Sequence, residues 1–310
     1  MHKSQPLTGT PARASEPAVQ SVRPGQVPQS ERSLARLCFL SVSKGELAPL
    51  EARTSAWQRL STLGLGVALA IDAAERRTLG WEAIAGLVKR AGELELAPGF
   101  VAGAGPDLLA SAGTIGDELE AASAQASVIE EAGGIPLLLP LAALSRRRAR
   151  EDEYVEAYRA LLARLSGPVL VDWTGPQVRP ELAGYFPNRS FERVLALDPA
   201  KVRGARFALG DVARETRLRR ELAQREQLLF TADRAHLGHL LLGLNPGPAA
   251  PRVPEILRDV DLGGQRVALG DFSHALLALS PAEAETLAQA LADLAVGDAA
   301  GCLRRLAKKA

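Results

Sequence analysis

Eight short apolar runs, separated by stretches of helical periodicity, constrain the fold of this 310-residue chain more than any other feature. Between them, as at 114–133, 151–167 and 213–226, apolar residues recur at i, i+3, i+4 and i+7, which predicts amphipathic helices. Runs that are apolar along most of their length are typical of a parallel sheet buried on both faces, and their alternation with helices predicts the α/β class. The runs cover residues 37–42, 64–71, 99–105, 135–140, 168–173, 204–209, 228–233 and 266–272.

Eight β/α units favour a closed (β/α)₈ TIM barrel, with an open doubly wound sheet as the alternative. Residues 1–33 are rich in Pro, Ser, Gln and Gly without apolar periodicity, so we expect a disordered tail there. Residues 34–310 then form one barrel domain, close to the roughly 250 residues typical of this fold. Segment 245–265 is long for a βα loop, and we expect it to hold either a short helix at 253–260 or a lid over the site. A final helix pattern opens with Ser-Pro-x-Glu at residue 280.

Composition excludes several classes of protein. A net charge of +1 and 4% aromatic residues argue against nucleic-acid binding. No apolar run approaches the roughly 20 residues that span a bilayer, and the start of the chain does not resemble a secretory signal, so we expect no membrane contact and a cytoplasmic location. Cys38 and Cys302 indicate neither a disulfide framework nor a zinc site, and we interpret both as apolar fillers. Lysine occurs only at Lys3, Lys44, Lys89, Lys201, Lys308 and Lys309.

The active site of such a barrel lies at the carboxyl ends of its strands, so the polar residues that close each apolar run are the candidates. As catalytic groups we expect Arg206, Asp172 and Asp233, with the two carboxylates as acid or base. The alternative for each aspartate is a helix cap or an ion pair. Candidate substrate-binding residues are Asp72, Gly103, Gly105, Asp107, Trp173, Thr174 and Arg234.

Histidine raises a separate possibility. Asp233, His236, His239 and His274 follow the seventh and eighth runs, and side chains from adjacent strand ends can bind a metal ion. The spacing is irregular, because i to i+6 does not keep two side chains on one helical face. We therefore expect these histidines to be structural, and we expect neither a metal nor a cofactor.

The order of these segments resembles the dihydrodipicolinate synthase and N-acetylneuraminate lyase superfamily of class I aldolase barrels. The resemblance covers roughly residues 60–244, and stretches 63–81, 175–186 and 200–211 are similar to an uncharacterised bacterial branch of it. It implies a small keto acid or sugar acid as substrate and, by analogy, a homo-oligomer. It also implies a Schiff base on a sixth-strand lysine, because an iminium stabilises the neighbouring carbanion.

The chain departs from that pattern at the reacting positions. Gly204-Ala205 is followed by Arg206 in place of lysine, and a guanidinium cannot form a Schiff base. The paired threonines expected near Asp72 and the tyrosine expected near Leu141 are missing. Lys201 falls at the start of the sixth run, so Lys44 is the one lysine that we expect could face the cavity.

Three hypotheses follow. In the first, the protein acts on or binds a small anionic metabolite without a Schiff base, and Arg206 holds a carboxylate or an enolate oxygen. In the second, it is a catalytically inactive relative with a ligand-binding or subunit role, in which Arg206 is locked against Asp172 or Asp233. In the third, it is a metal-dependent lyase or hydrolase.

Overall fold

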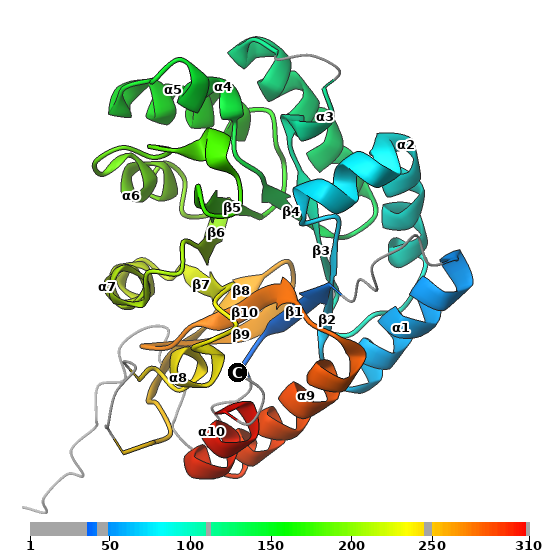
Figure 1. Cartoon of the computed structure of the whole chain (residues 1–310), viewed down its shortest axis with the longest axis vertical. Coiled ribbons are helices and arrows are strands. Elements are labelled where there is room, and N and C mark those ends of the chain that lie inside the picture. Colours follow the sequence, from blue (N-terminus) through cyan, green and yellow to red (C-terminus); the bar gives the residue numbers. More distant parts are fainter. Residues whose placement is uncertain (1–35, 42–48, 110–112, 245–249, 308–310) are drawn as a thin grey trace, which may run out of the picture.

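The computed structural model describes residues 36–41, 49–109, 113–244 and 250–307. The expected tail at 1–33, its boundary, and Lys44 lie outside these described residues. Eight parallel strands close into a barrel in the order β1-β10-β7-β6-β5-β4-β3-β2, and helices surround it (Figure 1). The predicted (β/α)₈ barrel is therefore confirmed. The barrel strands are β1 Cys38–Ser41, β2 Gly66–Leu69, β3 Phe100–Ala104, β4 Ile135–Leu138, β5 Val169–Thr174, β6 Val202–Ala208, β7 Leu228–Thr231 and β10 His274–Ala278.

The first seven apolar runs form β1 to β7, but the prediction for the eighth strand was wrong. Residues 266–272 supply most of β9 (Gln265–Gly270), which pairs antiparallel with β8 (Ile256–Leu262) outside the barrel sheet. The strand that closes the barrel is β10, in register with β1 at Cys38 and Ala275 and with β7 at Phe230 and His274.

The β8–β9 hairpin corrects both expectations for the described part of segment 245–265, since residues 250–265 form neither a helix at 253–260 nor a lid over the carboxyl ends. Val260 and Leu269 pack in one apolar cluster with Val101, Ile135 and Leu228, which lie at or near the starts of their strands. The hairpin therefore closes the amino-terminal end of the barrel. Its two-residue turn is Gly263-Gly264, and both glycines have positive φ (62° and 86°), as a primed hairpin turn requires.

Capping boxes begin the helices at 115–131 and 281–295, the second at the start that the Ser-Pro-x-Glu pattern predicts. Thr114 Oγ1 accepts a hydrogen bond from the Asp117 amide, and the Asp117 carboxylate accepts one from the Thr114 amide. Ser280 and Glu283 form the same capping box. The helices are α1 Leu50–Thr62, α2 Ala73–Gly92, α3 Ile115–Glu131, α4 Ala142–Arg146, α5 Glu151–Leu162, α6 Ser190–Leu195, α7 Val212–Gln224, α8 Leu237–Leu241, α9 Pro281–Ala295 and α10 Ala299–Ala307.

The final helix pattern forms two helices, α9 and α10, because the chain turns at Gly297 with φ 88°. Both cysteines are buried free thiols, and burial raises the pKa of Cys38 to about 12 and that of Cys302 to about 11. Within the described ranges, no helix is long and apolar enough to cross a membrane.

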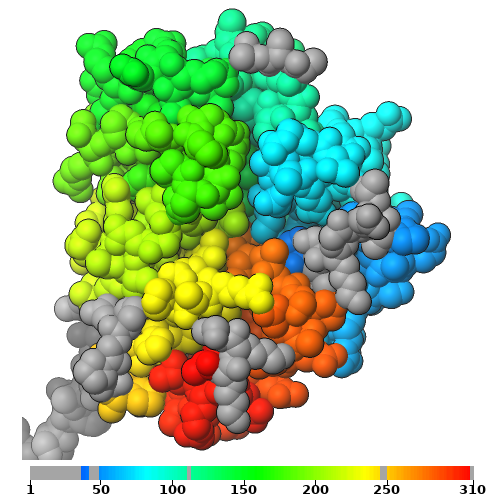
Figure 2. Space-filling model, viewed as in Figure 1, coloured from blue at the N-terminus to red at the C-terminus, as the bar shows by residue number. Residues whose placement is uncertain are grey.

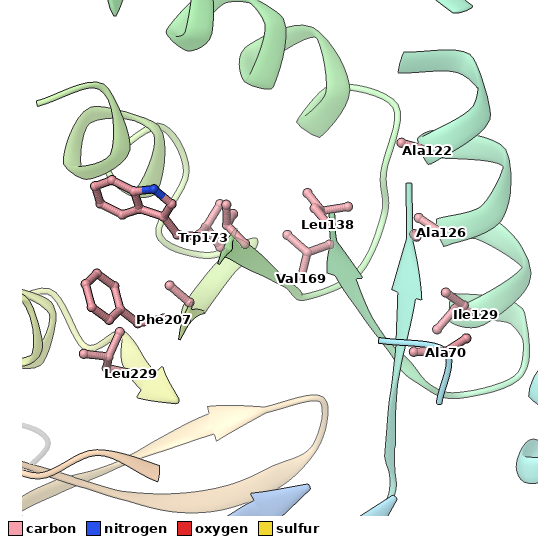
Figure 3. Packing of buried hydrophobic residues seen from close by; sticks show 14 of the residues in the cluster. Ala70, Ala122, Ala126, Ile129, Leu138, Val169, Trp173, Phe207 and Leu229 are labelled. Carbon is pink, nitrogen blue, oxygen red and sulfur yellow. The ribbon is translucent and has the colours of Figure 1, made fainter. Parts of the chain in front are cut away.

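Two apolar layers hold the barrel together. One lies inside it, where Phe39, Leu137, Leu170 and Phe230 meet the hairpin. The other lies between the strands and the helices, where Ala122, Ala126 and Ile129 of α3 face the sheet (Figure 3). Successive side chains of one strand point alternately into these two layers, so every second residue of a strand faces the barrel interior.

Glu215 of α7 is a buried carboxyl group in the layer between the helices and the strands. It accepts hydrogen bonds from Ser273 Oγ (2.7 Å) and Thr231 Oγ1 (3.1 Å), with Asp233 and Arg219 nearby. Burial outweighs these hydroxyl donors and raises its pKa from 4.5 to about 7. The folded state therefore holds a proton between pH 4.5 and 7 that the unfolded state has lost, and the free energy of unfolding decreases as pH rises through that window.

We expect Glu215→Gln to remove this penalty. At pH 8 the variant should be more stable than the parent by about 3 kcal/mol, which is the pKa shift converted to free energy, and near pH 4 the advantage should vanish. Chemical denaturation of both proteins at the two pH values measures the difference. A stability difference that does not change with pH would contradict the assignment.

Candidate functional site

A small cavity of about 50 Å³ lies at the carboxyl-terminal mouth of the barrel. Its walls come from the ends of β5 and β6 and from the loops after β2, β4 and β5. A space of this size holds a few water molecules or one carboxylate group. The lining residues are Ile71, Asp72, Ala73, Leu139, Pro140, Asp172, Thr174, Val178, Arg179, Arg206 and Ala208.

Arg206 of β6 lines this cavity and reaches past β7 to β10. Its Nη1 donates to Asp172 Oδ1 (3.0 Å) and its Nε donates to the carbonyl oxygen of Leu276 on β10 (2.9 Å). The Arg206 side chain is 13% exposed and that of Asp172 is 1% exposed, so the ion pair is largely shielded from solvent. These contacts fix the guanidinium in place, and its Nη2 donates no hydrogen bond within the described chain.

Both carboxylate oxygens of Asp172 accept hydrogen bonds. Its Oδ1 accepts from Arg206, and its Oδ2 accepts from Thr174 Oγ1 at 2.6 Å. The register places Asp172 directly opposite Arg206 on the neighbouring strand, and Thr174 follows on the same face of β5. Because both of its oxygens already accept hydrogen bonds, Asp172 positions the Arg206 guanidinium.

Arg179 also lines the cavity, although it was not among the candidate residues predicted from the sequence. It follows β5 in the loop before the short 3₁₀ turn Pro180–Leu182, and its Nε donates to Glu181 Oε1 at 2.8 Å. None of the hydrogen bonds among the described residues uses its two terminal nitrogens. The cavity therefore has two guanidinium groups with N–H donors to spare. The only available signal was the position of Arg179 soon after a strand end.

Asp72 also lines the cavity, and it caps α2. Its Oδ1 accepts from the amides of Ala74 (2.8 Å) and Glu75 (3.1 Å). The capping alternative thus holds for one oxygen of Asp72. The other oxygen, Oδ2, accepts no hydrogen bond from the part of the chain that the structure describes.

Gly103, Gly105 and Asp107 are held by a buried arginine and are not part of the cavity lining. Arg76 of α2 donates to both Asp107 oxygens from Nε (2.9 Å each), to the Gly103 carbonyl (2.6 Å) and to the Gly105 carbonyl (3.3 Å). Its Nη2 also donates to Gln125 Oε1 at 2.7 Å. Burial lowers the pKa of Arg76, and the ion pair with Asp107 opposes that shift. This network fastens the β3 turn to α2 and α3.

Trp173 points away from the cavity. It lies between the two inward-facing residues of β5, so the period of two places it on the outer face of the barrel. There it packs against Phe207 and Phe191, with ring centroids 5.7 and 4.4 Å away, and the guanidinium of Arg214 lies over its ring. Figure 3 shows Trp173 and Phe207 together in this outer layer.

Asp233 and Arg234 lie beyond the seventh strand and do not join the cavity lining. Asp233 accepts from the amide of His236 (3.1 Å), and its other oxygen pairs with His236 Nδ1 (2.8 Å). Arg234 forms an ion pair with Glu283 at the start of α9. The expected grouping of Asp233 with Arg206 and Asp172 is therefore not found.

The proposed metal ligands do not gather either. His274 lies at the start of β10, where its Nδ1 accepts from the Leu37 amide (3.0 Å) and its Nε2 donates to the Ala268 carbonyl (3.0 Å). Burial lowers the pKa of His274 to about 3, so the ring is neutral with both nitrogens in use. The described ranges contain no group of three or more metal-ligating side chains.

The described lysines do not reach the mouth. Lys201 precedes β6, and its Nζ donates to the Leu162 carbonyl at 3.0 Å, which places it at the amino-terminal end of the barrel as expected. Lys89 lies in the last turn of α2. In the described structure, the cationic side chains of the cavity lining are both arginines.

A family model described as "Protein of unknown function (DUF993)" matches residues 48–310. A search of curated proteins finds no match.

Three solved structures share the barrel fold of this chain. Dihydrodipicolinate synthase from Oceanobacillus iheyensis has 14% identity and a TM-score of 0.53, over 85% of this chain and 75% of its own. The enzyme of the same name from Agrobacterium tumefaciens has 19% identity and a TM-score of 0.50, over 66% of this chain and 67% of its own. N-acetylneuraminate lyase from Mycoplasma synoviae has 12% identity and a TM-score of 0.50, over 84% of this chain and 72% of its own.

Proposed function

Because the chain belongs to the DUF993 family, whose description assigns no activity, we propose its function from the geometry of the barrel mouth. We propose that the cavity binds one carboxylate of a small keto acid or sugar acid through Arg179 and Arg206, without a Schiff base. The observation that carries this proposal is the pair of guanidinium groups on one carboxylate-sized cavity. Arginine suits this task because its N–H groups match two carboxylate oxygens.

The likeness in fold supports the ligand class, since the similar structures are named as a dihydrodipicolinate synthase and an N-acetylneuraminate lyase. The cavity holds the carboxylate end alone, so the remainder of the ligand extends from it toward solvent. Asp172 acts as a positioning residue, because its two oxygens are bound to Arg206 and Thr174.

A calorimetric titration of the full chain at low ionic strength tests this proposal. With pyruvate as the probe, we expect one site per chain, and we expect Arg206→Gln and Arg179→Gln each to weaken binding at least tenfold, as loss of a charged hydrogen bond implies. Arg203→Gln is the matched control, because Arg203 lies on the same strand but donates to Pro199 and Asp261 carbonyls near the amino-terminal end. Equal binding by all four proteins would contradict the proposal.

Asp72 favours a second candidate, a lyase that works through an enolate. Asp72 lines the same cavity and is exposed, so at the solvent edge its Oδ2 would take a proton from the carbon next to the ligand carbonyl while Arg206 stabilises the enolate oxygen. In D₂O this candidate predicts loss of the pyruvate methyl signal in proton NMR, and Asp72→Asn should abolish the exchange while keeping the helix cap. Binding without exchange would leave ligand binding as the function and favour the inactive relative.

A further inference from the structure

A second cavity, of about 330 Å³, lies outside the barrel mouth between α8, α9 and α10. Figure 2 shows these segments in yellow, orange and red at one edge of the molecule. The walls are mainly leucine side chains, and the polar residues are two arginines, a glutamate and a threonine. The lining residues are Arg234, Ala235, Leu237, Leu279, Glu283, Thr286, Leu287, Arg305 and Leu306.

The size and chemistry of this space separate it from the mouth cavity. Its volume lies at the lower end of the range for small-molecule sites, whereas the mouth cavity has room for a single polar group. Leu237 and Leu287 are buried, and Leu306 packs against the same core. An apolar ligand body of several carbons gains free energy by leaving water for such a surface.

The charges define which end of the ligand is polar. Arg234 pairs with Glu283, and Arg305 donates to Asp293 (2.5 Å) and Gln289 (3.2 Å). Each arginine is therefore paired with one carboxylate, and the two guanidinium groups stand at the rim of an otherwise mainly apolar lining. Each guanidinium has five N–H donors, so both can donate to a further anionic partner without losing the present one.

From the two guanidinium groups and these apolar walls, we infer that the cavity between α8, α9 and α10 binds a medium-chain carboxylate. The alkyl chain lies among the leucines, and the carboxylate lies at the edge between Arg234 and Arg305. A small keto acid lacks the apolar body that this space would bury, and a neutral chain cannot form the charge-assisted hydrogen bonds that a carboxylate accepts from guanidinium groups. This inference is independent of the function proposed for the barrel mouth.

Titration of the full chain with octanoate tests the inference. We expect one site per chain, and each methylene removed, from octanoate to hexanoate, should weaken binding by about fourfold. Octan-1-ol, which has the same chain without the charge, should bind at least tenfold more weakly, and so should octanoate to Arg305→Gln. Binding that is insensitive to chain length, or equal for octanol and octanoate, would overturn the inference.

A cavity-filling variant locates the site. Ala235 is exposed at the edge of the cavity, so Ala235→Trp should fill the space without disturbing the core and should abolish octanoate binding. Ala213→Trp is the matched control, since Ala213 is an exposed residue of α7 outside the lining. Retained octanoate binding by Ala235→Trp would overturn the inference. So would a wild-type dimer that binds no octanoate and dissociates in Ala235→Trp, because the cavity would then contact a second copy.

Discussion

Arg76→Met is expected to lower the free energy of unfolding by about 3–5 kcal/mol, the largest single effect that this structure predicts. The Arg76 side chain is fully buried, and it binds Asp107, Gln125 and backbone carbonyls of the β3 turn. Methionine fills much of the same volume but leaves the buried carboxylate of Asp107 without its cation. An unpaired buried charge costs more than the ion pair itself contributes.

Urea denaturation measures the Arg76 effect, with the adjacent residue as the control. Arg77 lies on the exposed side of α2, so Arg77→Met should change stability by no more than about 0.5 kcal/mol. A double variant, Arg76→Met with Asp107→Leu, should recover part of the loss because it removes the orphaned charge as well. If Arg76→Met and Arg77→Met had the same free energy of unfolding, the Arg76 network would not contribute to the stability of the fold.

Asp172→Ala is expected to cost about 3 kcal/mol, at the lower end of the range for breaking a buried pair because Arg206 keeps 13% exposure. The variant leaves Arg206 with the Leu276 carbonyl as its remaining partner in the described structure. Arg206→Met in the same background should restore stability, since no charge is then left unpaired. Thermal unfolding of the two single variants and the double variant gives this coupling. Strictly additive losses would show that the pair is not energetically coupled.

The sequence predicted the barrel because its periodic signals are local. Apolar runs mark β1 to β7, and Thr114 and Ser280 mark the starts of α3 and α9 through bonds within one turn. The last strand was misplaced because 266–272 and 274–278 are both short and apolar. What separates them is long-range pairing with β1 and β7, which no local pattern contains. The Gly263-Gly264 turn was the one local sign of a hairpin.

The candidate site was predicted in part for an equally physical reason. Parallel strands bring their carboxyl ends together, so Asp172, Thr174 and Arg206 meet although Arg206 follows Thr174 by 32 positions in the sequence. The period of two would also have placed Trp173 outside, since its neighbours face inward. Arg179 lies in an irregular loop, whose path is set by packing and by Glu181 and not by periodicity.

A crystal structure of the full chain soaked with pyruvate tests the central claim most directly. The account predicts the pyruvate carboxylate in the barrel mouth, with its oxygens within hydrogen-bond distance of the Arg179 and Arg206 guanidinium groups and no covalent link to the protein. Electron density that is continuous from pyruvate C2 to a lysine Nζ would contradict it. So would a carboxylate bound away from both arginines.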